Sequence, residues 1–276
     1  MKMSLTTTSK LHNGVEIPSL GLGVYKVEDG QSVYDTVMSA LEIGYRHIDT
    51  ASFYENEEGV GKAIRESGIP REEIFVTTKV WNDEQGYENT KQAFQNSLDR
   101  LGLDYVDLYL VHWPVPGKYK ETWKALEEFY EDGKARAIGV SNFLPHHLED
   151  LLSDVKIRPM INQIELHPQL TQVETREYCK KHDILIQAWS PLGKARYLDD
   201  PTLTELAEKY SKTPAQIIIR WEFQSDIITI PKSVHAKRQK ENADIFDFEL
   251  TSDEIKHIDA LDQDKRTGPH PDEFNY

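Results

Sequence analysis

Cysteine is almost absent from the 276-residue sequence, which contains only Cys179. One cysteine cannot form an internal disulfide, which fits a reducing compartment, and it excludes a cysteine-rich metal site. Basic residues are also in the minority, since 32 Lys and Arg stand against 47 Asp and Glu and give a formal net charge of −15. A nucleic-acid-binding protein needs a positive field to attract phosphates, so we expect no nucleic-acid partner.

Long apolar runs are absent as well. No stretch of 18 or more apolar residues occurs, so we expect no membrane-spanning segment. The first ten residues are polar and lack the apolar centre of a secretory signal, which favours a cytoplasmic protein. Hydrophobic residues make up 38% and charged residues 29% of the chain, which is typical of a folded globular protein. No apolar interface pattern stands out, so a monomer is expected.

What the chain does contain is a repeat of short β-rich runs, each followed by a longer stretch with helical periodicity. Six consecutive runs begin 24 to 32 residues apart. Crossovers of this length force neighbouring strands to run parallel, and eight such units suit a (β/α)8 barrel. The predicted strands are 20–24, 46–49, 74–79, 106–111, 137–140, 161–165, 185–188 and 227–230. Helical faces between them are predicted by Val33, Val37 and Leu41, by Phe94, Leu98 and Leu101, and by Leu203, Leu206 and Tyr210.

A doubly wound open sheet is the alternative fold. It needs a GxGxxG loop after its first strand, and Gly21–Lys26 (GLGVYK) lacks the third glycine, so we reject it. No Pro-, Gly- or Ser-rich linker divides the chain, which predicts a single domain over residues 1–276. An Asn13-Gly14 pair predicts an N-terminal β-hairpin across the bottom of the barrel. Thr251–Glu254 (TSDE) has the pattern of a capping box, which predicts extra helices at the C-terminal end.

Four chemically distinctive side chains lie at or just beyond the ends of three successive predicted strands. Asp49 ends one strand and Tyr54 follows it, Lys79 ends the next, and His112 follows the one after that. Each alone has an ordinary explanation, such as a helix cap, a surface lysine or a hydrogen-bonded core histidine. Active sites of such barrels lie at the C-terminal strand ends, so their convergence predicts one shared site. Later strand ends carry Ser141, Asn142, Gln163, Glu165, His167, Trp189, Ser190 and Lys232.

The quartet has the composition of a proton-donating site. A tyrosine hydroxyl with a pKa near 10 is a poor acid at neutral pH, and a nearby lysine ammonium lowers that pKa. An aspartate paired with the lysine keeps it charged, and a histidine opposite can donate a hydrogen bond to a carbonyl oxygen. Another group must then attack the carbon. No Ser–His–Asp or Cys–His arrangement and no HExxH or CxxC motif stands out, so we expect no metal, and a hydride from a nicotinamide fits.

A basic segment follows the last predicted strand. Four of the chain's 32 basic residues fall within positions 232–240. A helix start there favours phosphate, so Lys232, Ser233 and Arg238 are candidates for the 2′-phosphate of NADP, with a solvated helix face as the alternative. Trp189 offers a flat face for stacking a ring. Ser141, Asn142 and Gln163 offer donors and acceptors that suit a carboxamide. Ordinary hydrogen bonds at the strand ends are the alternative interpretation.

Four segments, in order, resemble the sequence signatures of the aldo-keto reductases. Gly44–Gly61 (GYRHIDTASFYENEEGVG) resembles the first signature, and Ile230–Ser233 (IPKS), with Arg238 downstream, resembles the C-terminal one. Leu110–Pro114 (LVHWP) and Ile138–Phe143 (IGVSNF) match the middle blocks. The resemblance extends from position 10 to position 271, and it is closest to short bacterial members such as glyoxal, methylglyoxal and 2,5-diketo-D-gluconate reductases.

This resemblance implies a (β/α)8 barrel that binds NADPH and reduces aldehydes and small ketones. Dicarbonyls such as glyoxal and methylglyoxal are candidate substrates. It implies that Tyr54 is the general acid, that Lys79 lowers its pKa, that Asp49 pairs with Lys79, and that His112 orients the carbonyl. It assigns cofactor binding to Gly23, Val24, Ser141, Asn142, Gln163, Trp189, Ser190, Leu192, Lys232, Ser233, Val234, Arg238, Glu241 and Asn242.

Three departures from the family pattern bear on the substrate. Trp189 stands where tyrosine is frequent, Tyr25 stands where tryptophan is frequent, and the loops that shape the pocket are short. We therefore expect an open aromatic pocket that accepts several aldehydes and small ketones. Its expected lining is Tyr25, Phe53, Trp81, Trp113 and Phe274.

Two other functions are compatible with such a barrel. A redox-sensing regulatory subunit, like the β subunits of potassium channels, would bind NADPH tightly with turnover close to zero. A sugar-phosphate isomerase would be active without a cofactor. The short segment before the hairpin disfavours the first, and the arrangement of tyrosine, lysine and aspartate disfavours the second. The pair His146-His147 is expected at a helix start, solvated rather than bound to a metal.

Overall fold

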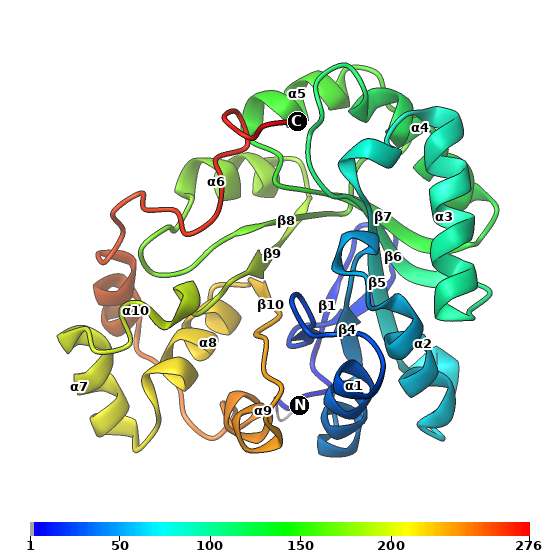
Figure 1. The fold of residues 1–276 in the computed structure, drawn as a ribbon. Coiled ribbons are helices and arrows are strands. Elements are labelled where there is room, and N and C mark those ends of the chain that lie inside the picture. Colours follow the sequence, from blue (N-terminus) through cyan, green and yellow to red (C-terminus); the bar gives the residue numbers. More distant parts are fainter. Residues whose placement is uncertain (1–2) are drawn as a thin grey trace.

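The computed structural model describes residues 3–276. Its centre is a curled sheet with the strand order β10-β9-β8-β7-β6-β5-β4-β3, in which all neighbouring strands are parallel (Figure 1). The sheet closes because Leu20 pairs in parallel with Thr229. The predicted (β/α)8 barrel is thus confirmed, and each predicted strand overlaps an observed one. The strands are β3 Leu22–Gly23, β4 His47–Asp49, β5 Phe75–Val80, β6 Val106–Val111, β7 Ala135–Ser141, β8 Ile161–Glu165, β9 Leu185–Trp189 and β10 Ile228–Thr229.

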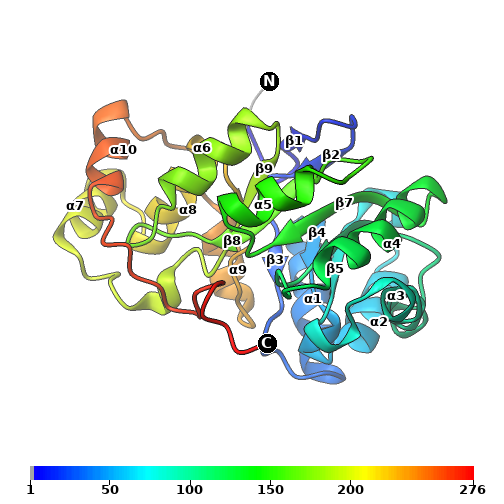
Figure 2. The same cartoon turned by 90° about the horizontal axis from the view of Figure 1, so that it is seen from above.

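Helices surround the barrel, as both views show (Figures 1 and 2). Several of them present an apolar stripe to the strands. Val33, Val37 and Leu41 of α1 are buried, as are Phe94, Leu98 and Leu101 of α3, which agrees with the spacing in the sequence. The helices are α1 Gln31–Ile43, α2 Glu57–Glu66, α3 Tyr87–Leu101, α4 Tyr119–Glu131, α5 Pro145–Leu152, α6 Val173–Lys181, α7 Pro201–Tyr210, α8 Pro214–Gln224, α9 Ala236–Ala243 and α10 Ser252–Asp259.

Two helices, α7 and α8, connect β9 to β10, whereas the sequence patterns indicate only the first. α8 is buried over most of its length, and Ile217, Ile218 and Ile219 in succession obscure a helical period. Its start does carry a clear signal, because Thr213 caps the helix in a capping box and Pro214 is its first residue. The expected C-terminal helix is α10, and the capping box of Thr251 with Glu254 is present.

The N-terminal hairpin covers the end of the barrel where the strands begin. Strands β1 Thr8–Lys10 and β2 Glu16–Pro18 are antiparallel. Asn13 in the connecting turn donates a hydrogen bond to the carbonyl oxygen of Arg136, near the start of β7 (3.0 Å). Figure 2 shows this hairpin and the C-terminus on opposite sides of the molecule. The chain after α10 therefore lies at the other end, where the strands terminate.

Residues 260–276 contain no strand or helix, yet they are held at defined points. Phe274 stacks on Trp113, just beyond β6, with ring centroids 4.4 Å apart. Further back, Thr267 and Gly268 donate hydrogen bonds to the carboxylate of Glu165 at the end of β8. In the described part of the chain no helix is long and apolar enough to cross a membrane.

Candidate active site

The four residues of the predicted quartet lie together at the C-terminal mouth of the barrel. Asp49 is the last residue of β4, Lys79 lies near the end of β5, and His112 follows β6 directly. Tyr54 ends a single 3-10 turn, Ser52–Tyr54, that follows β4. Ser52 ties this turn to the next strand, because its hydroxyl donates to the carbonyl oxygen of Lys79 (3.1 Å).

Lys79 is the centre of the group. Its ammonium nitrogen lies 2.6 Å from Asp49 Oδ1, 2.8 Å from the carbonyl oxygen of Thr50 and 3.2 Å from the hydroxyl oxygen of Tyr54. These three contacts use all three N–H bonds of the ammonium. Because Lys79 donates to the phenol oxygen, the proton of Tyr54 is left to point elsewhere. Both members of the ion pair are buried, so it is shielded from solvent.

The second carboxylate oxygen of Asp49 also has a partner. Gln163 on β8 donates its side-chain N–H to Asp49 Oδ2 over 2.7 Å. The same Gln163 nitrogen donates to the side-chain oxygen of Gln187 on β9 (3.1 Å). The carboxylate is therefore held at both oxygens, by an ammonium on one and an amide on the other.

Burial and the opposite charges of Lys79 and Asp49 shift the pKa values within the quartet. Burial raises the pKa of the Tyr54 hydroxyl above 10, while the charge of Lys79 pulls it down and that of Asp49 raises it. Burial lowers the pKa of Lys79, but Asp49 and Tyr54 outweigh it and the net shift is upward, so the ammonium stays charged. Burial, and then Lys79, lower the pKa of His112 well below 6.5, so its imidazole is neutral.

An aromatic wall borders the quartet. Phe53 stacks on Trp81 with centroids 3.7 Å apart, and Tyr25 lies 5.0 Å from the ring of Tyr54. Phe53 and Tyr25 are exposed, whereas Trp113 is only 6% exposed because Phe274 covers one face. Sequence reasoning placed all of these in the pocket lining. The tail makes the Trp113 side of the mouth less open than the short loops alone indicate.

The residues predicted to hold a carboxamide lie together, but several of their polar atoms already have partners. Ser141 Oγ donates to the carbonyl oxygen of Gln163 (2.8 Å). Asn142 donates through Nδ2 to the carbonyl oxygen of His112 (3.0 Å) and to Ser141 Oγ (3.2 Å). The Asn142 oxygen accepts from the indole N–H of Trp189 at 2.8 Å. Trp189 is half-buried and stands beside this cluster at the end of β9.

The basic segment lies between β10 and the first turn of α9. Lys232 is exposed and donates to the carbonyl oxygen of Lys26 (3.2 Å). Partial burial, and then repulsion from Lys26, lower its pKa. Ser233 is buried, and its hydroxyl accepts from the backbone N–H of His235. Of the other predicted contacts in this segment, the structure places Val234 and Arg238 in solvent, Glu241 half-buried and Asn242 buried.

The remaining predicted cofactor contacts lie between these two groups. Gly23 is required by packing, because a Cβ there would lie 2.8 Å from the carbonyl oxygen of Ile230. Val24 is fully buried, so only its backbone could face a ligand. Ser190, half-buried with a φ of 48°, and Leu192, half-buried, form the loop after Trp189.

Glu165 lies at the end of β8, where the sequence indicates no role for it. Glu165 is fully buried and accepts from Thr267 N (2.5 Å), Thr267 Oγ1 (2.7 Å) and Gly268 N (3.0 Å). His167 contacts the same carboxylate at 2.9 Å. A Cβ at Gly268 would lie 2.5 Å from the Trp189 ring, so the tail packs directly on the indole. Thr267 and Gly268 lie 102 and 103 residues after Glu165 in the sequence, so no local pattern indicates these contacts.

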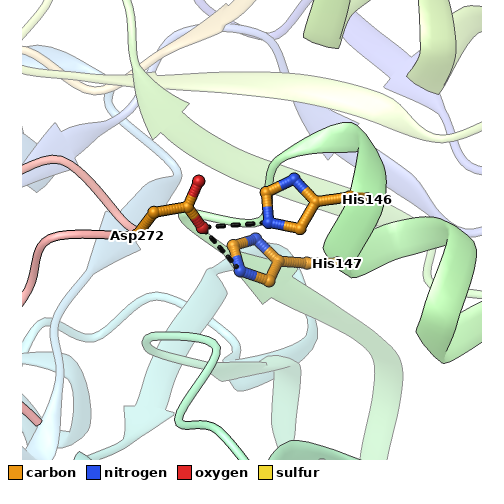
Figure 3. Close-up of side chains that lie close together, drawn as sticks. All are labelled: His146, His147 and Asp272. Atoms are coloured by element: carbon orange, nitrogen blue, oxygen red, sulfur yellow. Dashed lines mark hydrogen bonds and ion pairs between the residues drawn. The ribbon is translucent and has the colours of Figure 1, made fainter.

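The pair His146-His147 lies at the start of α5, as expected, but it is not simply solvated. Both Nε2 atoms contact Asp272 Oδ1 of the tail, at 2.9 Å and 3.2 Å (Figure 3). His147 is only 12% exposed, and its Nδ1 accepts the backbone N–H of Leu144 (3.1 Å). A neutral ring that accepts at Nδ1 carries its proton on Nε2, the atom that lies 3.2 Å from Asp272, while His146 is hydrogen-bonded to the same carboxylate oxygen. Metal ligation at that nitrogen would require the opposite tautomer, which favours a hydrogen-bonded attachment of the tail.

Known proteins are similar to this chain over most of its length. The model of the Aldo/keto reductase family matches residues 19–263. The chain is 59% identical to the glyoxal reductase of Bacillus subtilis, covering 99% of each chain. It is 47% identical to the methylglyoxal reductase DkgA of Escherichia coli, again covering 99% of each. A crystal structure of a Gox0644 mutant in complex with NADPH superposes with a TM-score of 0.94 at 45% identity, covering 98% of this chain and 99% of that one. The chain belongs to the aldo/keto reductase family.

Proposed function

We propose that this protein is an NADPH-dependent reductase of aldehydes and small ketones, with glyoxal and methylglyoxal among its substrates. The observation that carries the proposal is the contact of one buried ammonium, Lys79 Nζ, with both Asp49 and the hydroxyl of Tyr54. The names of the relatives, glyoxal reductase and methylglyoxal reductase, support the substrate class.

The residues present fit NADPH at two separated points. At the mouth, Trp189 offers an aromatic face beside the amide of Asn142. Just before α9, the cation Lys232 is repelled by a second cation, Lys26, so an anion between them would relieve repulsion. We propose that Lys232, Ser233 and Arg238 hold the 2′-phosphate, and that Ser141, Asn142, Gln163 and Trp189 hold the nicotinamide end. When bound, NADPH supplies a hydride to the carbonyl carbon.

The protein's own part is to deliver a proton to the carbonyl oxygen. Lys79 donates to the Tyr54 oxygen, so the phenol proton is free to point toward a substrate. As negative charge grows on the carbonyl oxygen, Tyr54 donates this proton, and the adjacent ammonium stabilises the phenolate that remains. Asp49 keeps Lys79 in place. The neutral His112, whose ring lies 5.9 Å from that of Tyr54, donates a second hydrogen bond to the same oxygen.

The aromatic wall explains why small aldehydes are proposed as substrates. Phe53, Trp81 and Trp113 offer flat apolar faces close to His112, with little that recognises a particular polar group. Such a lining separates substrates weakly, so several aldehydes are expected to react.

The test is consumption of NADPH with methylglyoxal and glyoxal, with wild-type protein and Tyr54→Phe side by side. Loss of the general acid is expected to reduce kcat by roughly 10²- to 10⁴-fold while NADPH binding, followed by quenching of its fluorescence, is retained. Equal rates in the two proteins would refute Tyr54 as the proton donor. Tight NADPH binding without reduction of any simple aldehyde would refute the proposed reductase activity.

A further inference from the structure

A chain of hydrogen bonds crosses the interior of the barrel, from the N-terminal hairpin to the catalytic carboxylate. His47 Nδ1 lies 3.0 Å from the carbonyl oxygen of Pro18 in β2. His47 Nε2 lies 3.3 Å from Gln187 Nε2, and the Gln187 oxygen lies 3.1 Å from Gln163 Nε2. Gln163 in turn contacts Asp49 Oδ2. His47, Gln187, Gln163 and Asp49 are all at most 1% exposed.

The direction of every bond in this chain is determined by its two ends. The carbonyl oxygen of Pro18 can only accept, so His47 carries its proton on Nδ1 and its Nε2 accepts. Gln187 must then present its NH₂ group to His47 and its oxygen to Gln163. At the other end the Asp49 carboxylate can only accept, which requires the NH₂ group of Gln163. Both ends therefore demand the same orientation of the two amides.

The neutral state of His47 keeps this arrangement intact. Burial lowers the pKa of His47, and although Asp49 and Asp107 raise it and Lys79 lowers it again, burial prevails. A protonated ring would donate at Nε2 and would repel the NH₂ group of Gln187. The chain is therefore complete only with a neutral imidazole.

We propose that His47 and Gln187 are positioning residues that hold Gln163 against Asp49 and thereby fix the Asp49–Lys79 pair on which Tyr54 depends. This role rests on the proposed reductase function. Neither residue touches the reacting atoms; each acts through the next member of the chain. The interior layers of such barrels are usually filled by branched apolar side chains. The hydrogen-bonding side chains of His47, Gln187 and Gln163 depart from that pattern. A buried polar network rigidifies its members when its donors and acceptors are paired, and every bond of this chain pairs one donor with one acceptor.

The effect on the proton donor has a definite sign. The groups that face Tyr54 are Lys79, Asp49, Tyr25 and His112, and among the charged ones Asp49 opposes ionisation of the phenol. The hydrogen bond that Gln163 donates partly neutralises the negative charge on the Asp49 carboxylate. Loosening that bond concentrates the charge on the carboxylate and raises the pKa of Tyr54. The alkaline limb of the reduction rate, where Tyr54 loses its proton, then moves to higher pH.

The experiment compares Gln187→Leu with Thr77→Val as a matched control. Thr77 is also a fully buried strand residue, and its hydroxyl has no hydrogen-bond partner among the described residues. Gln187→Leu is expected to raise the alkaline apparent pKa of kcat by about half a unit or more and to lower kcat at neutral pH roughly 3- to 10-fold. Thr77→Val is expected to leave both unchanged. An unchanged alkaline limb in folded Gln187→Leu, or Gln187→Met should Leu not fold, would overturn the proposal.

A double-mutant cycle tests whether His47 acts through Gln187. His47→Phe alone is expected to shift the alkaline limb in the same direction, and His47→Phe combined with Gln187→Leu to shift it no further than Gln187→Leu alone. Additive shifts would contradict the chain. Carbon-13 NMR of protein labelled at tyrosine Cζ, with the Tyr54 resonance identified through Tyr54→Phe, reads the same pKa without turnover. A shifted Tyr54 resonance in a protein that reduces no aldehyde would refute the reductase function and support the positioning role.

Discussion

The indole N–H of Trp189 donates a 2.8 Å hydrogen bond to the side-chain oxygen of Asn142. Asn142 has a φ of 64°, a left-handed conformation that asparagine tolerates better than most residues. Its amide group is bound to the carbonyl oxygen of His112. The donor of tryptophan is a ring atom, whereas that of tyrosine is a hydroxyl at the far end of the ring. The orientation of the predicted stacking face is therefore linked, through Asn142, to the strand end that carries His112.

Trp189→Phe separates the ring face from its hydrogen bond. The variant keeps an aromatic surface but leaves the Asn142 oxygen without its donor, so the ring is free to rotate. We expect the Kd for NADPH to rise about 3- to 10-fold, the usual value of one hydrogen bond. Fluorescence titration with NADPH measures it, and Trp123→Phe, which changes a buried tryptophan of α4, is the control. An unchanged Kd would mean that this hydrogen bond does not support cofactor binding.

The choice between NADPH and NADH is expected to depend on Lys232 and Arg238. Lys232 just before α9 and Arg238 in its first turn are both exposed cations. Loss of a charge-assisted hydrogen bond to phosphate typically lowers affinity by a factor of roughly 10 to 100. Lys232→Ala and Arg238→Ala should raise the KM for NADPH by that factor and leave the KM for NADH almost unchanged. Lys237→Ala, exposed on the same helix, is the control. A parallel loss for both cofactors would place the phosphate elsewhere.

The barrel and the quartet could be predicted because their signals are local. Strand spacing gave the fold, and Asp49, Lys79 and His112 could be placed at one mouth because parallel strands end at the same side. The connections made by the tail could not be predicted. Glu165 meets Thr267 and His147 meets Asp272 only after the chain has folded, and no spacing rule joins positions so far apart.

The interior hydrogen-bond chain was invisible for a different reason. Gln187 lies in a run of strand residues where any side chain could face either the helices or the barrel axis. Its partner His47 lies 140 residues earlier in the sequence. Only the closed barrel brings the two together.

Asp272→Ala is expected to release the end of the tail. Asp272 contacts both His146 and His147 (Figure 3). Two residues later, Phe274 covers Trp113. Without this attachment Phe274 leaves the mouth more often, so the KM for an aromatic aldehyde should rise roughly 3- to 10-fold, as expected for one stacked pair. The KM for methylglyoxal should change less. Glu273→Ala, exposed beside it, is the control, and equal KM values for benzaldehyde in both variants would contradict the attachment.

Glu165 is expected to make stability depend on pH. Burial opposes its charge, but hydrogen bonds from His167, Thr267 and Gly268 prevail, so the folded-state pKa lies below that of an unfolded glutamate, about 4.3. A depressed carboxyl pKa stabilises the folded state above the unfolded value, and this contribution is lost as pH falls through the folded one.

Glu165→Gln should therefore be less stable than the wild type at pH 7, by about 1–3 kcal/mol, because its NH₂ group faces the tail's N–H donors. The gap should narrow as the pH falls below about 4.3 towards the folded-state pKa, because the wild-type carboxylate then becomes protonated. Urea unfolding at a series of pH values measures it, with Glu174→Gln, in the first turn of α6, as the control. Since Gly268 packs on Trp189, the same variant should also weaken NADPH binding. A gap that stays constant from pH 7 to well below the unfolded pKa of about 4.3 would show that the hydrogen bonds to Glu165 do not depend on its charge.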